Sequence, residues 1–217
     1  MKTLFLSLAI LAISIAASSQ SVKVDYYKDF YKHKVASEKK AKYKEVSSKN
    51  EDGVKTIAFY GVKDNMLYRI SNYLNDQPVG IWKAYDKKGN LINERNFDEL
   101  VYETPKKEEK DSMPLDTINL VYPTYGSETD RITYLMRNVS YPKEAVDRWI
   151  QGTVYLTFVI SKEGDVTQIK IIKSVNPFLD YEAYRVIKAM GKWKPATKDG
   201  KPIEMTMSMP IKFTLAG

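Results

Sequence analysis

The feature of this sequence that most constrains the fold is a pair of β-rich runs between residues 152 and 175. In the first run, Gly152-Thr-Val-Tyr-Leu-Thr-Phe-Val-Ile160, apolar side chains alternate with Thr, Tyr and Val. A period of two predicts a strand with one face on a core. The second run, from Val166 to Val175, follows a short loop that contains Gly164, and such a loop is typical of an antiparallel hairpin. We predict that this hairpin organises residues 141–217 and that the upstream chain provides delivery, spacing or accessory structure.

The chain before the hairpin carries the signals of two helices. Ser127-Glu-Thr-Asp130 resembles a capping box in which Asp replaces the usual Glu or Gln. A helix that ends near Asn138 is predicted to follow, and its apolar residues are Ile132, Leu135, Met136 and Val139. A second helix is predicted to start at Tyr141-Pro142, because proline is favoured in the first turn. Its apolar side consists of Ala145, Val146, Trp149 and Ile150.

The chain after the hairpin predicts a third helix and a last strand. The helix follows Asn176-Pro177, and its apolar residues at helical spacing are Leu179, Ala183, Val186, Ile187 and Met190. Gly191 and Pro195 stop it, and residues 198–202 form a turn. The strand spans residues 204–215, and its core face consists of Met205, Met207, Met209, Ile211 and Phe213. Because proline cannot donate to a ladder, Pro210 predicts that this strand lies at a sheet edge.

Upstream of these elements, residues 54–97 alternate short β-like pieces with turn formers and predict a small all-β meander. Within it, Tyr73-x4-Pro78-x-Gly80-x-Trp82-x2-Tyr85-x3-Gly89-x-Leu91 resembles one copy of a MORN-like repeat. The alternative is a generic meander whose Trp and Tyr side chains are core. Residues 20–53 lack a clean period and are interpreted as a poorly defined lead-in with an edge strand, whereas residues 98–125 are charged and predict a solvated linker.

The amino terminus has the pattern of an export signal. A short basic start precedes an apolar run from Leu4 to Ala17, and Ala17-x-Ser19 suits cleavage before Gln20. The run is shorter than the roughly 20 apolar residues of a membrane-spanning helix. We therefore expect a signal peptide at residues 1–19 and a periplasmic protein; the alternative is an uncleaved anchor in the inner membrane that faces the periplasm.

Composition argues against most catalytic chemistry. The chain has no cysteine and a single histidine, His33, which excludes disulfides, thiolate chemistry and clustered-histidine metal sites. His33 lies in a polar stretch without a nucleophile elbow, and we interpret it as a surface residue. No Arg-rich helix, zinc spacing or aromatic RNA-binding motif accompanies the net charge of +7. We therefore expect no enzyme, no cofactor, no metal site and no nucleic-acid partner.

The last 90 or so residues, from Ser127 to Gly217, resemble the C-terminal domain of the TonB family. The resemblance rests on Tyr141-Pro142-x2-Ala145, Gly152-x-Val154-x-Leu156-x-Phe158-x-Ile160, Gly164-x-Val166, Ser174, Leu179-Asp180-x-Glu182-Ala183, Val186, Trp193-x-Pro195 and Pro210-Ile-x-Phe213. It implies an α+β domain over residues 126–217, with a three-stranded antiparallel sheet and helices on one face, preceded by the all-β meander.

The resemblance also implies a function. In the family, the exposed edge of the last strand captures the TonB box, an extended peptide of an outer-membrane TonB-dependent receptor, during energy-coupled transport across the outer membrane. Strand addition of this kind uses main-chain pairing at an open edge. The implied peptide-binding residues are Met205, Thr206, Met207, Ser208, Met209 and Ile211. The family-motif residues are Tyr141, Pro142, Gly152, Gly164, Trp193 and Pro195.

The chain departs from the family in its first half. Members of the TonB type carry an uncleaved transmembrane helix that contacts the ExbB–ExbD proton channel, followed by a long Pro-rich spacer. Here the apolar run is short, and residues 98–125 hold few prolines. We expect a contact with ExbB–ExbD only if the amino terminus is an uncleaved anchor. The alternative function is a non-energised envelope scaffold that binds other proteins or peptidoglycan. The sequence is also compatible with a homodimer.

Overall fold

The computed structural model describes residues 22–30, 32–104 and 119–215. Contacts divide the chain into two compact units, Met1–Arg95 and Asn96–Gly217. The signal peptide expected at residues 1–19 and the middle of the linker expected at residues 98–125 lie outside the described residues. Within the described part of the chain, no helix has the length and apolar character needed to cross a membrane.

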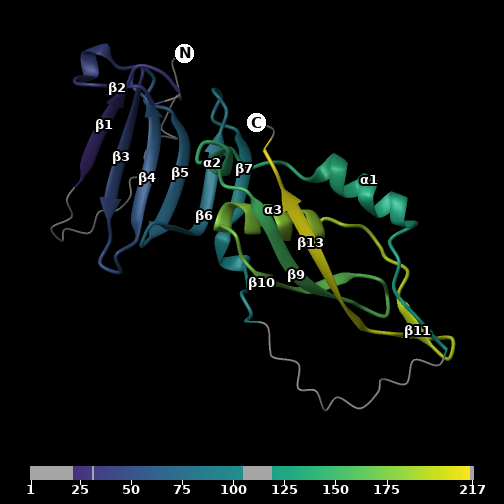
Figure 1. Cartoon of the computed structure of the whole chain (residues 1–217). Helices are drawn as coiled ribbons and strands as arrows, with labels where there is room; N and C mark the ends of the chain where they lie inside the picture. Colours follow the sequence, from purple (N-terminus) through teal and green to yellow (C-terminus); the bar gives the residue numbers. More distant parts are fainter. Residues whose placement is uncertain (1–21, 31, 105–118, 216–217) are drawn as a thin grey trace, which may run out of the picture. The chain divides into compact units, whose positions relative to one another are not determined.

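The first unit is a seven-stranded sheet with the order β2-β1-β3-β4-β5-β6-β7 (Figure 1). Its elements are β1 (Lys23–Tyr27), β2 (Lys34–Val35), η1 (Glu38–Lys40), β3 (Tyr43–Lys49), β4 (Lys55–Gly61), β5 (Leu67–Leu74), β6 (Gln77–Tyr85) and β7 (Leu91–Asn96). From β3 onward, strands that follow each other in sequence are neighbours in the sheet. The sheet starts well before residue 54, because the lead-in expected over residues 20–53 contributes three strands.

Aromatic side chains build the interior of this first unit. Phe59 is buried and stacks on Tyr43, with ring centroids 5.4 Å apart. Trp82, from the MORN-like pattern, is also buried, and its indole N–H donates to the carbonyl of Asn72 at 2.9 Å. The β5–β6 turn is formed by Asn75 and Asp76, which both have positive φ, as a type I′ hairpin requires. The MORN-like resemblance itself stays a prediction.

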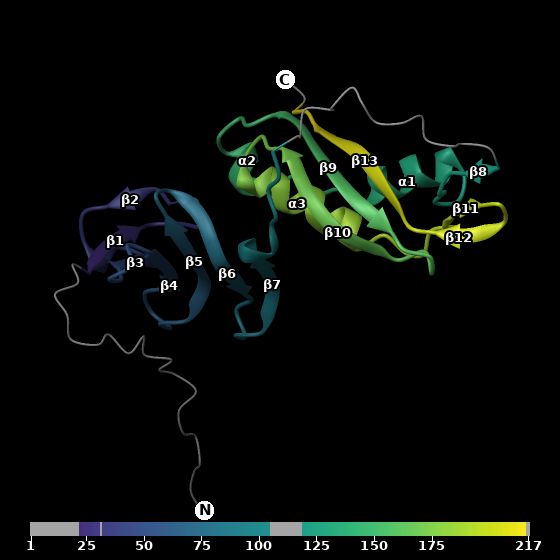
Figure 2. The ribbon, with the colours of Figure 1, turned by 90° about the horizontal axis from the view of Figure 1, so that it is seen from below.

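The second unit contains a three-stranded antiparallel sheet with the order β10-β9-β13 (Figure 2). Its strands are β9 (Gly152–Ile160), β10 (Val166–Lys173) and β13 (Met205–Phe213), and its helices are α1 (Glu128–Asn138), α2 (Lys143–Val146) and α3 (Pro177–Lys188). The register between β9 and β13 is unbroken from the Met205–Ile160 pair to the Phe213–Gly152 pair. Helix α3 packs against β9 and β10. The α+β fold class, with a three-stranded sheet after an all-β region, is therefore confirmed.

The alternate apolar residues of the predicted hairpin lie on one buried face of the sheet. Val154, Leu156, Phe158 and Ile160 of β9 are fully buried and pack with the apolar face of α3. On β13, Met209, Ile211 and Phe213 are buried and Met205 and Met207 are half-buried, whereas the four residues between them are exposed. The prediction that the Met-rich face belongs to the core and that β13 is an edge strand is confirmed.

The helix predictions hold for α1 and α3 and fail for part of α2. The capping box of α1 is present, since Asp130 N–H donates to Ser127 Oγ at 3.1 Å and Ser127 N–H donates to Asp130 Oδ2 at 2.8 Å. Helix α2 ends at Val146, so the prediction that it continues through Trp149 and Ile150 was wrong. Trp149 adopts a φ of 53° and is 69% exposed, and this left-handed conformation ends the helix.

A second small sheet, absent from the sequence prediction, joins distant segments of this unit. It has the order β12-β11-β8, with β8 (Leu120–Val121), β11 (Ala196–Lys198) and β12 (Lys201–Ile203). The turn expected at residues 198–202 is therefore the tip of a hairpin. Strand β8 and the short helix η2 (Phe97–Glu99) come from the two ends of the expected linker, and both ends belong to the second unit.

Candidate functional site

The outer edge of β13 is an open sheet edge. The strand pairs with β9 on one side, and no described strand pairs with it on the other. An unpaired strand edge presents a row of free N–H and C=O groups that can pair with another extended chain. Which residues supply these groups follows from the direction of the main chain in β9.

That direction is set at the hairpin loop. The N–H of Ser161 donates to the carbonyl of Asp165 at 2.9 Å, so Ser161 points toward β10. Main-chain groups of alternate residues in a strand point to the same side, so the odd-numbered residues of β9 face β10 and the even-numbered ones face β13. The hydroxyl of Thr167 on β10 donates to the carbonyl of Val159 at 3.3 Å, which agrees with this assignment.

The register then fixes the open side of β13. Even-numbered residues of β9 pair with odd-numbered residues of β13, as in the pair Met207–Phe158. In such pairs the main-chain groups point at one another, and those of the residues between them point away. The outward groups of β13 therefore belong to Thr206, Ser208, Pro210 and Lys212. Since Pro210 has no N–H, the stretch that offers both donors and acceptors is centred on Thr206 and Ser208.

The residues implied by the family resemblance divide into two sets on this strand. Thr206 and Ser208 direct their main-chain groups outward and their side chains to the exposed face. The other four use their main-chain groups to hold β13 on β9, and their side chains lie on the helix-facing side; they are Met205, Met207, Met209 and Ile211. The strand offers peptide-pairing groups at alternate residues only.

At the opposite edge of the sheet, the chain itself pairs with one residue of β10, Ile171. Ile171 of β10 donates its N–H to the carbonyl of Val101 at 2.7 Å and accepts from the N–H of Glu103 at 2.9 Å. Tyr102 forms a parallel bridge with Ile171, and Lys170 lies 3.1 Å from the Glu103 carboxylate. Sequence reasoning assigned these residues to a solvated linker, and the apolar pair Val101-Tyr102 was the signal that could have marked them.

Tyr102 also reaches a buried carboxylate. Asp180 in the first turn of α3 is 0% exposed and accepts from Ser174 Oγ at 2.6 Å, the N–H of Val175 at 3.2 Å and the Tyr102 hydroxyl at 3.2 Å. Burial raises the pKa of Asp180 above its usual range, although these hydrogen bonds oppose the shift. Burial beside this carboxylate also raises the pKa of Tyr102.

The Asp180 cluster predicts a pH-dependent stability. Because its pKa is higher in the folded state, Asp180 stabilises the fold below its unfolded pKa of about 3.9, and this contribution is lost as pH rises through the folded pKa. The Asn side chain of Asp180→Asn is neutral at every pH. We therefore expect this variant to lack the pH-dependent contribution of Asp180 to the free energy of unfolding. Urea unfolding of both proteins between pH 3.5 and 7 should show the wild type losing stability relative to the variant as pH rises. A difference that stays constant over this range would contradict the assignment.

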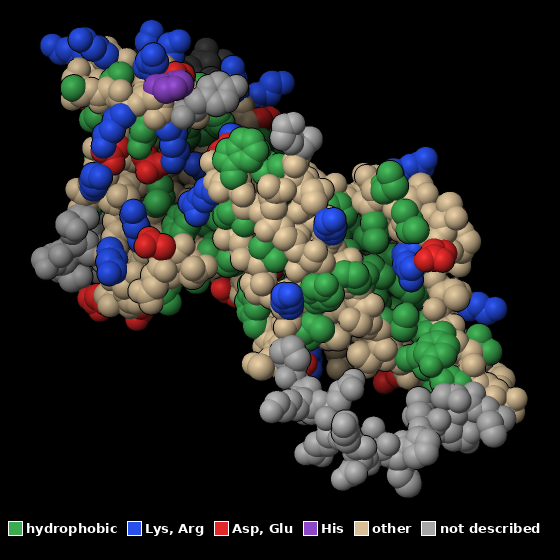
Figure 3. Space-filling model, viewed as in Figure 1, with side chains coloured by type: hydrophobic (Ala, Val, Ile, Leu, Met, Phe, Trp, Pro, Cys, Tyr) green, Lys and Arg blue, Asp and Glu red, His purple; other side chains and the backbone are tan. Residues whose placement is uncertain are grey.

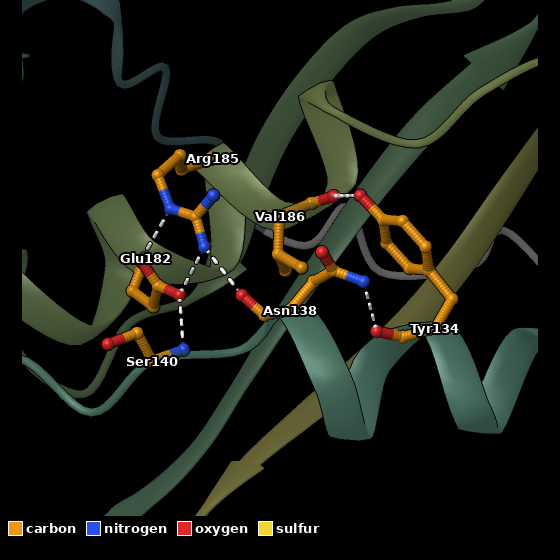
Figure 4. Close-up of polar contacts among 6 residues, drawn as sticks. All are labelled: Tyr134, Asn138, Ser140, Glu182, Arg185 and Val186. Carbon is orange, nitrogen blue, oxygen red and sulfur yellow. Dashed lines mark hydrogen bonds and ion pairs between the residues drawn. The ribbon is translucent and has the colours of Figure 1, made fainter.

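Helix α1 is held in place by a polar network with α3 (Figure 4). Arg185 of α3 donates to both oxygens of Glu182 at 2.7 Å and to the carbonyl of Asn138 at 2.7 Å, which caps the end of α1. Glu182 also accepts from the N–H of Ser140 at 2.6 Å. Tyr134 donates its hydroxyl to the carbonyl of Val186 at 3.1 Å. These contacts, of which the sequence indicated only Glu182, fix the side of α1 that faces α3.

The family-motif residues lie at element ends and in packing contacts of the second unit. Tyr141 donates to the carbonyl of Ile150 at 2.6 Å, and Pro142 is the N-cap of α2. Gly152 begins β9. Trp193 is buried against Phe158, and two residues later the half-buried Pro195 precedes β11. None of these residues belongs to β13, whose outer edge is unpaired among the described strands.

The C-terminal part of the chain is similar in sequence to known proteins. Residues 137–215 match the family model described as "Gram-negative bacterial TonB protein C-terminal". The chain is 36% identical over 77 residues to "Protein TonB" from two strains of Helicobacter pylori, J99 and 26695. The match covers 35% of this chain but only 26% and 25% of those relatives. No solved structure matches significantly. In sequence and in fold class, residues 137–215 are thus similar to the C-terminal domain of TonB proteins.

Proposed function

We propose that the second unit binds the TonB box of an outer-membrane TonB-dependent receptor by strand addition to the outer edge of β13, as part of transport across the outer membrane. The observation that carries this proposal is the open edge centred on Thr206 and Ser208, whose N–H and C=O groups have no partner among the described residues. The match to the TonB C-terminal family supports the choice of partner.

The chemistry of this edge selects an extended peptide. A net contribution of about 1 kcal/mol per hydrogen bond makes the four main-chain groups of Thr206 and Ser208 worth a few kcal/mol. Ordering the peptide costs about 1–2 kcal/mol for each residue fixed. Main-chain pairing alone therefore gives weak binding, and side-chain contacts have to supply the rest.

The test is a substitution that removes one outward donor. Ser208→Pro deletes an N–H on the open side and places a ring against the incoming strand, while the β9–β13 hydrogen bonds stay intact. We expect the Kd for TonB-box peptides from the same organism to rise at least about tenfold. Titration of the full chain with labelled peptides, followed by fluorescence anisotropy, measures this change.

Two controls make the result interpretable. Ser208→Thr keeps the N–H and the hydroxyl and should bind like the wild type, and thermal melts should show that both variants fold. Absence of binding by the wild type at high micromolar peptide would remove the proposal. Pull-downs dominated by peptidoglycan or by non-receptor proteins would favour the envelope scaffold instead.

The proposed setting is the periplasm, where the domain would meet such a receptor. Coupling to ExbB–ExbD belongs to the proposal only for a chain that keeps a membrane anchor. Amino-terminal sequencing of the protein from cells separates the two cases, since a chain that starts at Gln20 has lost the apolar run. An intact Met1 would instead support a role in energy transduction.

A further inference from the structure

We propose that α1 forms an apolar wall beside the open edge of β13, and that Ile132 and Met136 select partners with apolar side chains at two alternate positions. This inference rests on strand addition as the proposed function and names the chemistry of the peptide. The sequence interpretation placed both residues on the apolar side of α1, yet in the structure Ile132 is 48% and Met136 is 80% exposed.

The side of α1 that carries this pair follows from the helical angle. Ile132 and Met136 are four residues apart and share one flank, whereas Tyr134 is two residues from each and points about 200° away. Tyr134 donates its hydroxyl to α3, and α3 lies under β9 and β10. The flank with Ile132 and Met136 therefore faces away from α3, which packs under β9 and β10.

The arrangement in space agrees with this direction. Helix α1 lies beside β13 in two perpendicular views (Figure 1, Figure 2). Hydrophobic side chains gather over α1 and the adjoining part of β13 (Figure 3). On β13, Met205 and Met207 are half-buried on the helix-facing side, and Met207 packs against the core. In the proposed arrangement, these two residues and the exposed Ile132 and Met136 form an apolar strip next to Thr206 and Ser208; methionine is suited to such a surface because its flexible side chain adapts to different partners.

An added strand would place its side chains on this strip at every second residue. Peptide residues opposite Met205 and Met207 direct their side chains to the helix-facing side, because directly paired residues share a face. Alternate residues of a strand are about 6.7 Å apart. Four residues of helix rise about 6 Å, so the spacing of Ile132 and Met136 is close to that of two alternate peptide side chains. A peptide with two apolar residues at i and i+2 fits this pair.

The experiment uses two synthetic octapeptides as probes. One has the sequence Lys-Thr-Val-Thr-Val-Thr-Thr-Lys, and the other has Thr in place of both Val residues. We expect the full-length wild type to bind the Val peptide about tenfold more tightly, because burial of the two Val side chains adds apolar contact. The double variant Ile132→Thr/Met136→Gln should lose most of this preference, and only the part that Met205 and Met207 supply should remain. Both side chains are exposed, so the substitutions leave the core intact.

A matched control separates a local effect from a general loss of apolar surface. Val146→Thr/Trp149→Gln also removes two exposed apolar side chains, but these lie just before Gly152, whose partner Phe213 is at the far end of β13 from Met205. This control should keep the preference for the Val peptide. An Ile132→Thr/Met136→Gln protein that keeps it as well would overturn the role of α1 and leave strand addition standing. Failure of the wild type to bind either peptide, or binding that Ser208→Pro does not weaken, would overturn strand addition itself.

Discussion

Gly164→Ala is expected to destabilise the second unit by about 3–4 kcal/mol. Gly164 has a φ of 84°, and a Cβ at this position would lie 2.0 Å from the carbonyl oxygen of Trp193. That oxygen belongs to the main chain and cannot rotate away. The loop would have to move and would break the hydrogen bond from Trp193 N–H to the Gly164 carbonyl, which is 2.9 Å long. Chemical denaturation of the full chain, with a probe of Trp193 burial, measures the loss.

Gly200→Ala is the matched control for backbone strain. Gly200 has a φ of 75°, and a Cβ there would meet nothing within 4 Å. Its cost should be only the left-handed strain of about 1 kcal/mol. The difference between the two variants therefore isolates the collision with Trp193. Equal losses in both variants would show that the loop relieves the collision with Trp193 without cost and would contradict this prediction.

Arg185→Ala is expected to cost about 2 kcal/mol and to loosen α1. The variant leaves the Glu182 carboxylate, with 8% of its side chain exposed, without its cation. Breaking a fully buried pair costs roughly 3–5 kcal/mol, but the Arg185 side chain is 41% exposed and already partly solvated. The variant also removes the cap on the Asn138 carbonyl. Hydrogen exchange in α1 should increase, and this measurement distinguishes a local loosening from general unfolding.

Lys188→Ala provides the comparison for Arg185→Ala on the same helix. Lys188 pairs with Glu99 at 2.8 Å, and both side chains are more than a third exposed. Ion pairs of this kind contribute at most about 1 kcal/mol. Exchange in α1 should stay as in the wild type. A loss as large as that of Arg185→Ala would mean that the Glu182 contact behaves as an ordinary surface pair.

The sequence predicted those parts of the site that depend on a local period. Alternation in residues 205–213 was sufficient to place Met209 and Ile211 in the core, and Pro210 marked the strand as an edge. The sequence could not show which of the six predicted peptide-binding residues direct their main-chain groups outward. That depends on the register between β9 and β13, which no local sequence pattern contains. Only the hydrogen bond at Ser161 and the pairing with β9 distinguish Thr206 and Ser208 from their neighbours.

Other features depend on contacts between segments that are distant in sequence. The helical spacing of α1 does not distinguish Leu135, which packs on the core, from Met136, which is exposed. Both residues belong to the apolar side of the helix. The charged composition after Asp98 did not predict the pairing of Val101 and Glu103 with Ile171. This pairing depends on the edge of β10 and not on the local strand propensity of residues 101–103. Trp149 ended α2 through a left-handed φ that its residue type does not favour.

The pairing of Val101 and Glu103 with Ile171 has a consequence for stoichiometry. A sheet that is open at both sides can accept a strand at each, and molecules joined in this way can continue into an unlimited chain. Here Val101 and Glu103 occupy the β10 edge at Ile171, so a strand that adds along this edge would have to displace them, whereas β13 has no partner on its outer side among the described strands. Addition of a partner segment at β13 is then favoured, and growth into an unlimited chain through this sheet is disfavoured relative to a one-to-one complex.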